Sequence, residues 1–321
     1  MNSKENPKVL NDFLKYLRIK NYSLGTIEGY YLDLILFFNF LNEYLELNIN
    51  IRQFNVFILA SVKESDIIAF LVHVNYEREN TGITRQRKLT SIRTFFKWLF
   101  NNYPSLSNKI NPAIAINNIQ TVLKIPKYLT LDEAKQIKHI FNSNNSIYPI
   151  RNNMIINLFL NTGMRLSELR YTNVNDINFC EKCIQIIGKG NKERKIFLNE
   201  TILYQLKEYL KSENIENYNI DRPLFMSRQG NRLAKTTVQA ICQNAFKLLG
   251  IEEKKFSTHT LRHTFATIMY KATNGDILLL KELMRHDSIE STQIYTHIDN
   301  QQLKNAYESN PLGNFGLEEA G

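Results

Sequence analysis

The chain has 321 residues, of which 43% are hydrophobic and 22% are charged, and its formal net charge is +9. This length suits two domains with real cores, and the composition is typical of a globular protein. No stretch approaches 18 consecutive apolar residues and the first residues lack the apolar core of a signal peptide, so we expect neither a membrane span nor a secretory signal.

The first third of the sequence is predicted to be helical. Residues 9–46 show apolar spacing of three to four, with a break at Ser23–Gly25 after which Thr26 is a plausible N-cap. Two more helices are expected at 64–76 and 81–102. The sequence therefore predicts an all-α N-terminal domain.

The helix predicted at 81–102 carries an unbalanced charge. Its basic residues lie largely off the apolar stripe, with no acid between positions 85 and 97; they are Arg85, Arg87, Lys88, Arg93 and Lys97. Such a run is either a solvated face or a helix that follows DNA phosphates. The net charge of +9 is compatible with both, since it fits a polyanionic partner as well as simple solubility.

The remainder reads as an α-rich domain with a small antiparallel sheet. Residues 110–130 contain two prolines and no clear period, which indicates a linker. Thr130 and Glu133 predict a capping box, and "CIQIIGKGNKERKIFLN" predicts a β-hairpin. Helices are expected at 150–162, 200–212, 235–249, 259–273, 276–285 and 290–297.

Two segments place cationic side chains at turns. Arg165 follows the helix end at Gly163, and Glu168 lies three residues on, on the same side of the next helix, where it could orient the guanidinium. Lys189 stands between two glycines at the tip of the predicted hairpin. Taken singly, Arg165 and Glu168 are more typical of an ordinary surface ion pair, and Lys189 of a hairpin lysine kept for solubility.

Two further segments combine histidines with other polar groups. Thr258 is expected to cap a helix on which His259, Arg262 and His263 share one face, and a helix N-terminus with two imidazoles and a guanidinium suits an anion. His286 ends one helix, and Tyr295 lies nine residues later in the next.

Other chemistries lack their motifs. The sequence has no phosphate-binding P-loop, dinucleotide fingerprint, zinc-protease motif or nucleophile elbow. The pair Cys180 and Cys183 has no second pair at zinc-finger spacing, so we interpret these two as half-buried reduced thiols; Cys242 stands apart. No metal or other cofactor is expected.

The candidate groups make chemical sense together around a phosphodiester. Arginines bind non-bridging oxygens and stabilise the charge of a pentacoordinate transition state. A tyrosine needs a cationic site and a base to become a nucleophile, and a leaving 5′-oxygen needs a proton donor such as a mobile lysine.

These segments resemble the boxes of tyrosine recombinases of the phage integrase family, and the Xer-like members most. "TGMRLSEL" is similar to the first arginine box, "GKGNKER" to the hairpin lysine, "HTLRH" to the H-x-L-R-H box and "RHDSIESTQIYTH" to the closing box. "SLGTIEGYYLDLILFFNFL" and "TRQRKLTSIRTFFKWL" resemble the SAM-like core-binding domain. Four boxes in order are far more specific than any one.

The resemblance implies a role for each matching residue. Arg165 and Arg262 would hold the scissile phosphate, with Glu168 steadying Arg165 and His263 supporting. Lys189 would protonate the 5′-oxygen, His259 would assist proton transfer at the tyrosine, and His286 would support the phosphate. Tyr295 would form the 3′-phosphotyrosyl bond. The family usually has Leu-Gly before the histidine of the closing box, where this chain has Met284-Arg285.

The resemblance also implies an organisation. It assigns a core-binding domain to 1–116, a linker to 117–127, a catalytic domain to 128–308 and a tail to 309–321, whose Leu312, Phe315 and Leu317 would dock on a neighbouring protomer. The two domains would form a C-clamp around DNA, and four protomers on two sites would exchange strands through a Holliday junction in the cytoplasm, at the nucleoid. Further candidate DNA contacts are Arg228, Arg232, Lys235 and Gln239.

Two alternatives stay open at this point. A type IB topoisomerase shares the catalytic logic, and a catalytically silent DNA-binding protein could use the same fold. The sequence does not indicate the DNA site, the need for a partner recombinase, or whether the role is chromosome dimer resolution, mobile-element integration and excision, or inversion.

Overall fold

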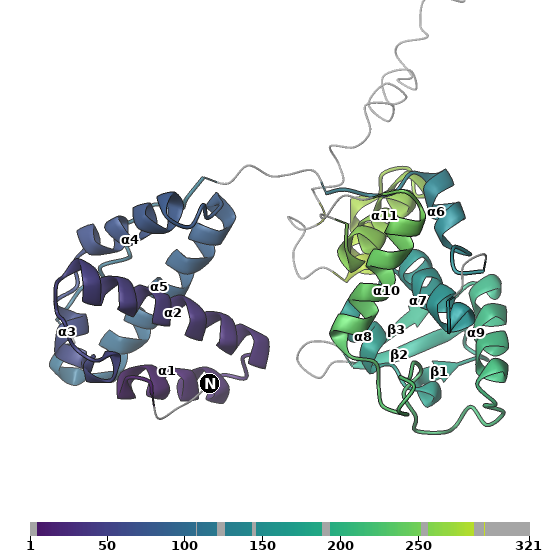
Figure 1. Ribbon diagram of the computed structural model, residues 1–321, viewed down its shortest axis with the longest axis horizontal. Coiled ribbons are helices and arrows are strands. Elements are labelled where there is room, and N and C mark those ends of the chain that lie inside the picture. The colour runs from purple at the N-terminus through teal and green to yellow at the C-terminus, as the bar shows by residue number, and fades with distance from the viewer. Residues whose placement is uncertain are drawn as a thin grey trace, which may run out of the picture. The chain divides into compact units, whose positions relative to one another are not determined.

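The computed structural model describes residues 5–106, 108–120, 126–142, 146–187, 193–251, 256–285 and 292. It divides into two compact units, Met1–Leu123 and Lys124–Gly321, each with its own hydrophobic core (Figure 1). The architecture is mainly helical with one small sheet, as the sequence predicts.

The first unit is all helical in the part that the structure describes. Its α-helices are α1 (Lys8–Ile19), α2 (Leu24–Tyr44), α3 (Val56–Ala60), α4 (Glu64–Tyr76) and α5 (Gly82–Asn102), with short 3-10 turns at Ile51–Gln53 and Pro104–Leu106. Helices α2 and α5 pack on each other and each contacts α1 and α4 (Figure 1). The core between them is aromatic, and Phe13, Phe38 and Phe95 meet there in edge-on ring contacts.

The helix boundaries are close to prediction, with two differences. Helix α2 begins one turn earlier than expected, because the Ser23 hydroxyl accepts the backbone N–H of Thr26; Ser23 is the N-cap and the expectation for Thr26 was wrong. Helix α3 was not predicted. Its five residues are nearly all apolar, so they show no helical period, although Asn55 caps it by accepting from two backbone N–H groups.

Helix α2 is long and apolar enough to cross a membrane by length and composition alone. The core helix of a globular domain passes the same test. Here the helix buries Phe37, Phe38 and Leu41 against its neighbours and also carries Asp33, whose carboxylate is 1% exposed and ion-paired within the unit. We therefore interpret α2 as a core helix.

The chain after α5 folds back onto that helix. Arg93 donates to the carbonyls of Ala113, at 3.0 Å, and Ile116, and to the side chain of Asn118 at 2.7 Å. Gln86 fixes the next residue by accepting the backbone N–H of Ile119 at 2.7 Å. Residues 118 and 119, expected in the linker, thus bond to the first unit.

The second unit surrounds helix α7 (Pro149–Thr162), which contacts α8 (Leu166–Tyr171), α9 (Glu200–Ser212), α10 (Lys235–Leu248) and α11 (Thr258–Ala272). Helix α6 (Leu131–Ile137) precedes it and has the predicted capping box at Thr130 and Glu133. Helix α7 is buried along almost its whole length, including the polar side chains of Arg151, Asn152 and Asn153.

A three-stranded antiparallel sheet completes the second unit. Strands β1 (Ile177–Asn178), β2 (Cys183–Ile187) and β3 (Glu193–Phe197) lie in the order β1-β2-β3, with Gln185 opposite Lys195. The predicted hairpin is β2–β3. A 3-10 turn at Val174–Asp176 leads into β1.

Helices α11 and α12 (Ile277–Met284) pack on each other through Phe265, Leu280 and Met284. The N-cap of α11 is Ser257, whose backbone N–H and side chain pair with Thr260, so the expectation that Thr258 caps it was wrong. The helix expected at 290–297 and the tail lie outside the described residues, apart from Thr292.

Candidate active site

Arg262 is anchored at the ends of two helices. It projects from the second turn of α11, is only 8% exposed, and donates to the carbonyl of Gly163 and, at 2.6 Å, to that of Met284. Gly163 ends α7 and Met284 is the last residue of α12. Carbonyls at helix C-termini lack intrahelical partners and carry the negative end of the helix dipole, so they suit a guanidinium.

Arg165 is held by a buried carboxylate. Glu168 accepts from the Arg165 backbone N–H at 2.6 Å and from its guanidinium at 2.9 Å. The Glu168 side chain is 9% exposed and that of Arg165 is 37% exposed, so the arginine keeps an open side while the acid does not. This is the contact that the spacing of three predicts.

The two arginines converge on one place in the fold. Arg165 donates at 2.8 Å to the carbonyl of Arg285, the residue directly after Met284, to which Arg262 is bound. The C-terminal end of α12 therefore holds both guanidiniums side by side. Guanidiniums fixed in this way form a preorganised site for an oxyanion, since little reorganisation is needed when charge develops.

His259 lies one turn before Arg262 on α11. The pKa of its imidazole is lowered from the ordinary 6.5, first by burial of part of the ring and then by the positive charges of Arg262, Lys235 and Arg165. The lowered pKa favours the neutral ring, which can accept a proton. His263 is half-buried on the same helix.

Three expected catalytic residues, Lys189, His286 and Tyr295, lie outside the described residues. The described part places their neighbours: β2 and β3 flank the segment with Lys189, and Arg285 directly precedes His286. No group of three or more His, Cys, Asp or Glu that could hold a metal occurs among the residues described. Cys180, Cys183 and Cys242 are free thiols, of which Cys180 is exposed and the other two are buried.

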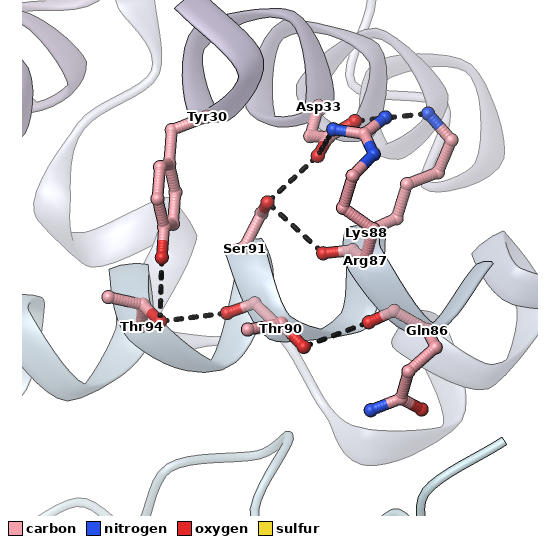
Figure 2. A network of polar contacts seen from close by, with 8 residues as sticks. All are labelled: Tyr30, Asp33, Gln86, Arg87, Lys88, Thr90, Ser91 and Thr94. Carbon is pink, nitrogen blue, oxygen red and sulfur yellow. Dashed lines mark hydrogen bonds and ion pairs between the residues drawn. The ribbon is translucent and has the colours of Figure 1, made fainter. Parts of the chain in front are cut away.

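The basic run of α5 is partly neutralised from another helix. Asp33 of α2 accepts from Arg87 at 2.5 Å, Lys88 at 3.1 Å and Ser91 at 2.8 Å (Figure 2). The side chain of Lys88 is 9% exposed and that of Arg87 is 53% exposed. Lys88 is therefore committed to the core, contrary to the expectation that it contacts DNA, whereas Arg87 keeps an accessible edge.

Two more expected DNA contacts bond within their own unit. Arg93 holds residues 113–118, and Arg232 donates to the carbonyls of Arg170 and Thr172 and to the side chain of Asn173. Buried carbonyls need these donors, so both arginines have a structural use. The other expected contacts are Arg85, which is half-buried, Lys97, Arg228 and Lys235, which are exposed, and Gln239, which is half-buried.

Comparison with known proteins places this arrangement in a family. The profile of the phage integrase family matches residues 127–302, and that of the phage integrase N-terminal SAM-like domain matches residues 10–102. The chain belongs to the phage integrase family of tyrosine recombinases. It is a tyrosine-type site-specific recombinase of the Xer-like kind that acts on DNA.

Curated relatives of this recombinase span its whole length. It is 38% identical over 315 residues to "Tyrosine recombinase XerC" of Caldanaerobacter subterraneus subsp. tengcongensis, covering 95% of this chain and 87% of the relative. It is 29% identical to "Tyrosine recombinase XerD" of Oceanobacillus iheyensis, covering 94% and 97%.

Solved structures of a site-specific recombinase and of two integrases share the fold. XerH site-specific recombinase bound to palindromic difH substrate, in a post-cleavage complex, matches with a TM-score of 0.72 and 25% identity, covering 94% of this chain and 83% of that one. The Tn1549 transposon integrase in complex with transposon right end DNA matches with a TM-score of 0.70 and 17% identity, covering 94% and 98%. A lambda integrase dimer bound to a COC′ core site matches in fold, with a TM-score of 0.62 and 16% identity, covering 88% and 94%.

The sequence did not reveal the acceptors that hold the cations in each unit. The carbonyls of Gly163, Met284 and Arg285 and the carboxylate of Asp33 decide where the arginines and Lys88 lie. Backbone carbonyls have no sequence signature, and Asp33 is more than 50 residues away from the cations it binds. In the sequence, the glycine at 163 and the unusual dipeptide Met284-Arg285 mark the positions of these three carbonyls.

Proposed function

We propose that this recombinase cuts and rejoins DNA through a covalent bond between Tyr295 and the 3′-phosphate of the cleaved strand. The observation that carries the proposal is the convergence of Arg165 and Arg262 on consecutive carbonyls at the end of α12. Because these two cations are fixed before DNA arrives, they can bind the non-bridging oxygens and stabilise the added charge of the transition state.

The proton transfers in this proposal use a base and an acid. Neutral His259 assists removal of the proton from the Tyr295 hydroxyl as its oxygen attacks phosphorus. Lys189 gives a proton to the 5′-oxygen as its bond to phosphorus breaks, and the reverse sequence reseals the strand. His286 supports the phosphate, and His263 supports Arg262 from the same helix. The proposed reaction uses neither a metal ion nor ATP.

The DNA contacts that we propose are the basic and amide side chains that the fold leaves exposed or half-buried. In the first unit these are Arg85, Arg87 and Lys97; in the second they are Arg228, Lys235 and Gln239. Lys235 lies near enough to His259 to lower its pKa, which connects the first turn of α10 with the cleavage site. We assign 1–116 to core binding and 128–308 to catalysis, with the linker predicted at 117–127, whose residues 118 and 119 bond to the first unit, allowing both domains to clamp one duplex.

We further propose that four copies act on two core sites, with or without a partner recombinase, and exchange strands through a Holliday junction. A lambda integrase dimer bound to a core site and XerH bound to difH support assembly on DNA. The tail at 309–321 would join neighbouring protomers. Such DNA substrates lie at the nucleoid, in the cytoplasm, and either chromosome dimer resolution or mobile-element movement would use them.

A nicked suicide duplex tests the proposal. Cleavage near the nick releases a short fragment that diffuses away, so the covalent intermediate should accumulate in the presence of a metal chelator. Denaturing gels should show a DNA–protein adduct that protease destroys. A core-site duplex that is bound but never yields the adduct would favour a silent DNA-binding protein instead.

The lowered pKa of His259 leads to a pH prediction. Cleavage at saturating DNA should fall as pH drops through a value below 6.5, because only the neutral ring accepts a proton. Lys235→Gln removes one of the positive charges that lower this pKa. It should therefore shift the acidic limb of the pH–rate profile, where cleavage falls, to higher pH. Single-turnover cleavage rates across pH measure both.

Lys271→Gln is the matched control for that shift. Lys271 is exposed in the last turn of α11, roughly 18 Å from His259 by the rise of the helix. Its replacement should leave the acidic limb in place. An acidic limb that stays fixed in Lys235→Gln would remove His259 from the proton transfer.

A further inference from the structure

Arg285 occupies a backbone conformation that favours glycine. It follows α12 with φ 51° and ψ 53°, in the left-handed region. A side chain in this region costs free energy that glycine avoids, and a glycine commonly ends a helix in this way. The position therefore disfavours an arginine unless its side chain makes a stabilising contact.

The side chain of Arg285 connects α12 with the sheet. Its guanidinium donates to the backbone carbonyl of Lys195 in the middle of β3. Lys195 is paired with Gln185, so the contact reaches both strands of the β2–β3 hairpin. The Arg285 guanidinium is partly buried, and burial lowers its pKa from 12.5 while the carboxylate of Glu168 acts in the opposite direction. It therefore belongs to the same electrostatic cluster as Arg165.

The backbone of Arg285 serves the arginine site at the same time. Its carbonyl accepts from Arg165 at 2.8 Å, and the preceding carbonyl accepts from Arg262. One residue thus bonds to Arg165 through its main chain and to β3 through its side chain. A displacement of β3 relative to the arginine pair would have to break one of these two contacts.

We propose that Arg285 is a positioning residue, which fixes the β2–β3 hairpin relative to Arg165 and Arg262. The proposal rests on the function proposed above, in which Lys189, between these strands, protonates the leaving 5′-oxygen. Loss of the Arg285 side chain should therefore impair departure of the 5′-oxygen, while binding of the phosphate by the arginine pair persists. The competing role is a direct contact from Arg285 to a non-bridging phosphate oxygen.

Substrate chemistry distinguishes the two roles. A duplex with sulfur in place of the bridging 5′-oxygen loses a thiolate, and since a thiol has a pKa of about 8.5 this group departs without a proton donor. A duplex with a methyl group in place of one non-bridging oxygen lacks the acceptor that a direct contact would use. The sulfur substrate makes the proton donor unnecessary, and the methyl substrate makes a direct contact to that oxygen impossible. Comparing the variant on both substrates separates the two roles, as in a double-mutant cycle.

The variant to test is Arg285→Gly, which removes the side chain and suits the left-handed backbone. Single-turnover cleavage of the ordinary nicked duplex should be slower by about 10- to 100-fold, the loss that a small misplacement of a catalytic group produces. DNA affinity should change little. With the sulfur substrate the variant should cleave within about threefold of the parent protein, if the loss lies in protonation. Lys281→Ala, one turn earlier on α12, removes a charge from the same helix and should cleave normally on every substrate.

Three results would overturn the positioning role. They are normal cleavage of the ordinary duplex, a loss that persists with sulfur, and a loss that disappears with the methyl substrate. Lys189→Ala, measured alongside, keeps the two proposals apart. If sulfur fails to rescue Lys189→Ala, the assignment of the general acid is wrong; if it rescues Lys189→Ala but not Arg285→Gly, the role of Arg285 is wrong.

Discussion

Replacing Arg262 by lysine is expected to slow DNA cleavage by about 10²- to 10³-fold, the loss seen when one preorganised donor is removed from an oxyanion site. The guanidinium of Arg262 reaches the carbonyls of Gly163 and Met284 at once. An ammonium has one charge centre, no planar fork and no second bidentate edge for the phosphate, so it cannot hold both carbonyls and the substrate. Single-turnover cleavage of the nicked duplex at saturating protein measures the effect.

Arg151→Lys is the matched control for Arg262→Lys. Arg151 is also 8% exposed and also donates to a backbone carbonyl, that of Met226 at 2.8 Å. It lies near the start of α7, roughly 18 Å from Gly163 by the rise of the helix. The two variants should lose similar stability, and only Arg262→Lys should lose cleavage below the melting temperature. Equal cleavage by both variants would mean that Arg262 has a structural role only.

Replacing Gly163 by alanine should destabilise the second unit by about 2–5 kcal/mol. Gly163 has φ 59°, where a side chain costs roughly 1–2 kcal/mol. A Cβ there would also lie 2.2 Å from Cδ1 of the buried ring of Phe265, and overpacking of this kind costs roughly 1–3 kcal/mol more. Denaturant unfolding of the second unit measures the change.

Gly250→Ala separates the backbone cost at Gly163 from the cost of the contact with Phe265. Gly250 has φ 82° in the same unit, but a Cβ at this position meets no atom within 4 Å. Only the backbone cost of about 1–2 kcal/mol should appear there. The difference between the two variants then reports the contact with Phe265, and equal losses would show that α11 can move away from the end of α7.

Most of the fold follows from local patterns in the sequence. The apolar residues and the residues at the helix ends predict the bounds of α4, α7, α9 and α10 to within one or two residues. The errors at Ser23 and Ser257 share one cause. Each has a second hydroxyl residue nearby, and which oxygen faces the open N–H groups depends on the backbone entering the helix.

The sequence predicts which side chains belong to the site but not how they are arranged in space. Four boxes of the phage integrase family identify the catalytic candidates, and the spacing of three predicts the pair Arg165–Glu168. The contacts that fix Arg262 are long-range bonds to main-chain carbonyls, which depend on how α7, α11 and α12 pack. Local sequence carries no information on that packing.

The basic run of α5 shows the same limit for DNA contacts. The run contains no acidic residue of its own, but the carboxylate that pairs with two of its cations, that of Asp33, lies on α2. Ion pairing removes Lys88 from the surface, and main-chain carbonyls engage Arg93. The sign and spacing of the charges in the sequence therefore overestimate how many of these cations can contact a DNA phosphate.

The most direct measurement of the central claim is the identity of the residue that carries DNA in the trapped adduct. The chain has 16 tyrosines. Protease digestion of the adduct followed by mass spectrometry should find the nucleotide on the peptide that contains Tyr295, and Tyr295→Phe should bind the duplex with unchanged affinity and form no adduct. A nucleotide on any other residue, or an adduct formed by Tyr295→Phe, would contradict the account.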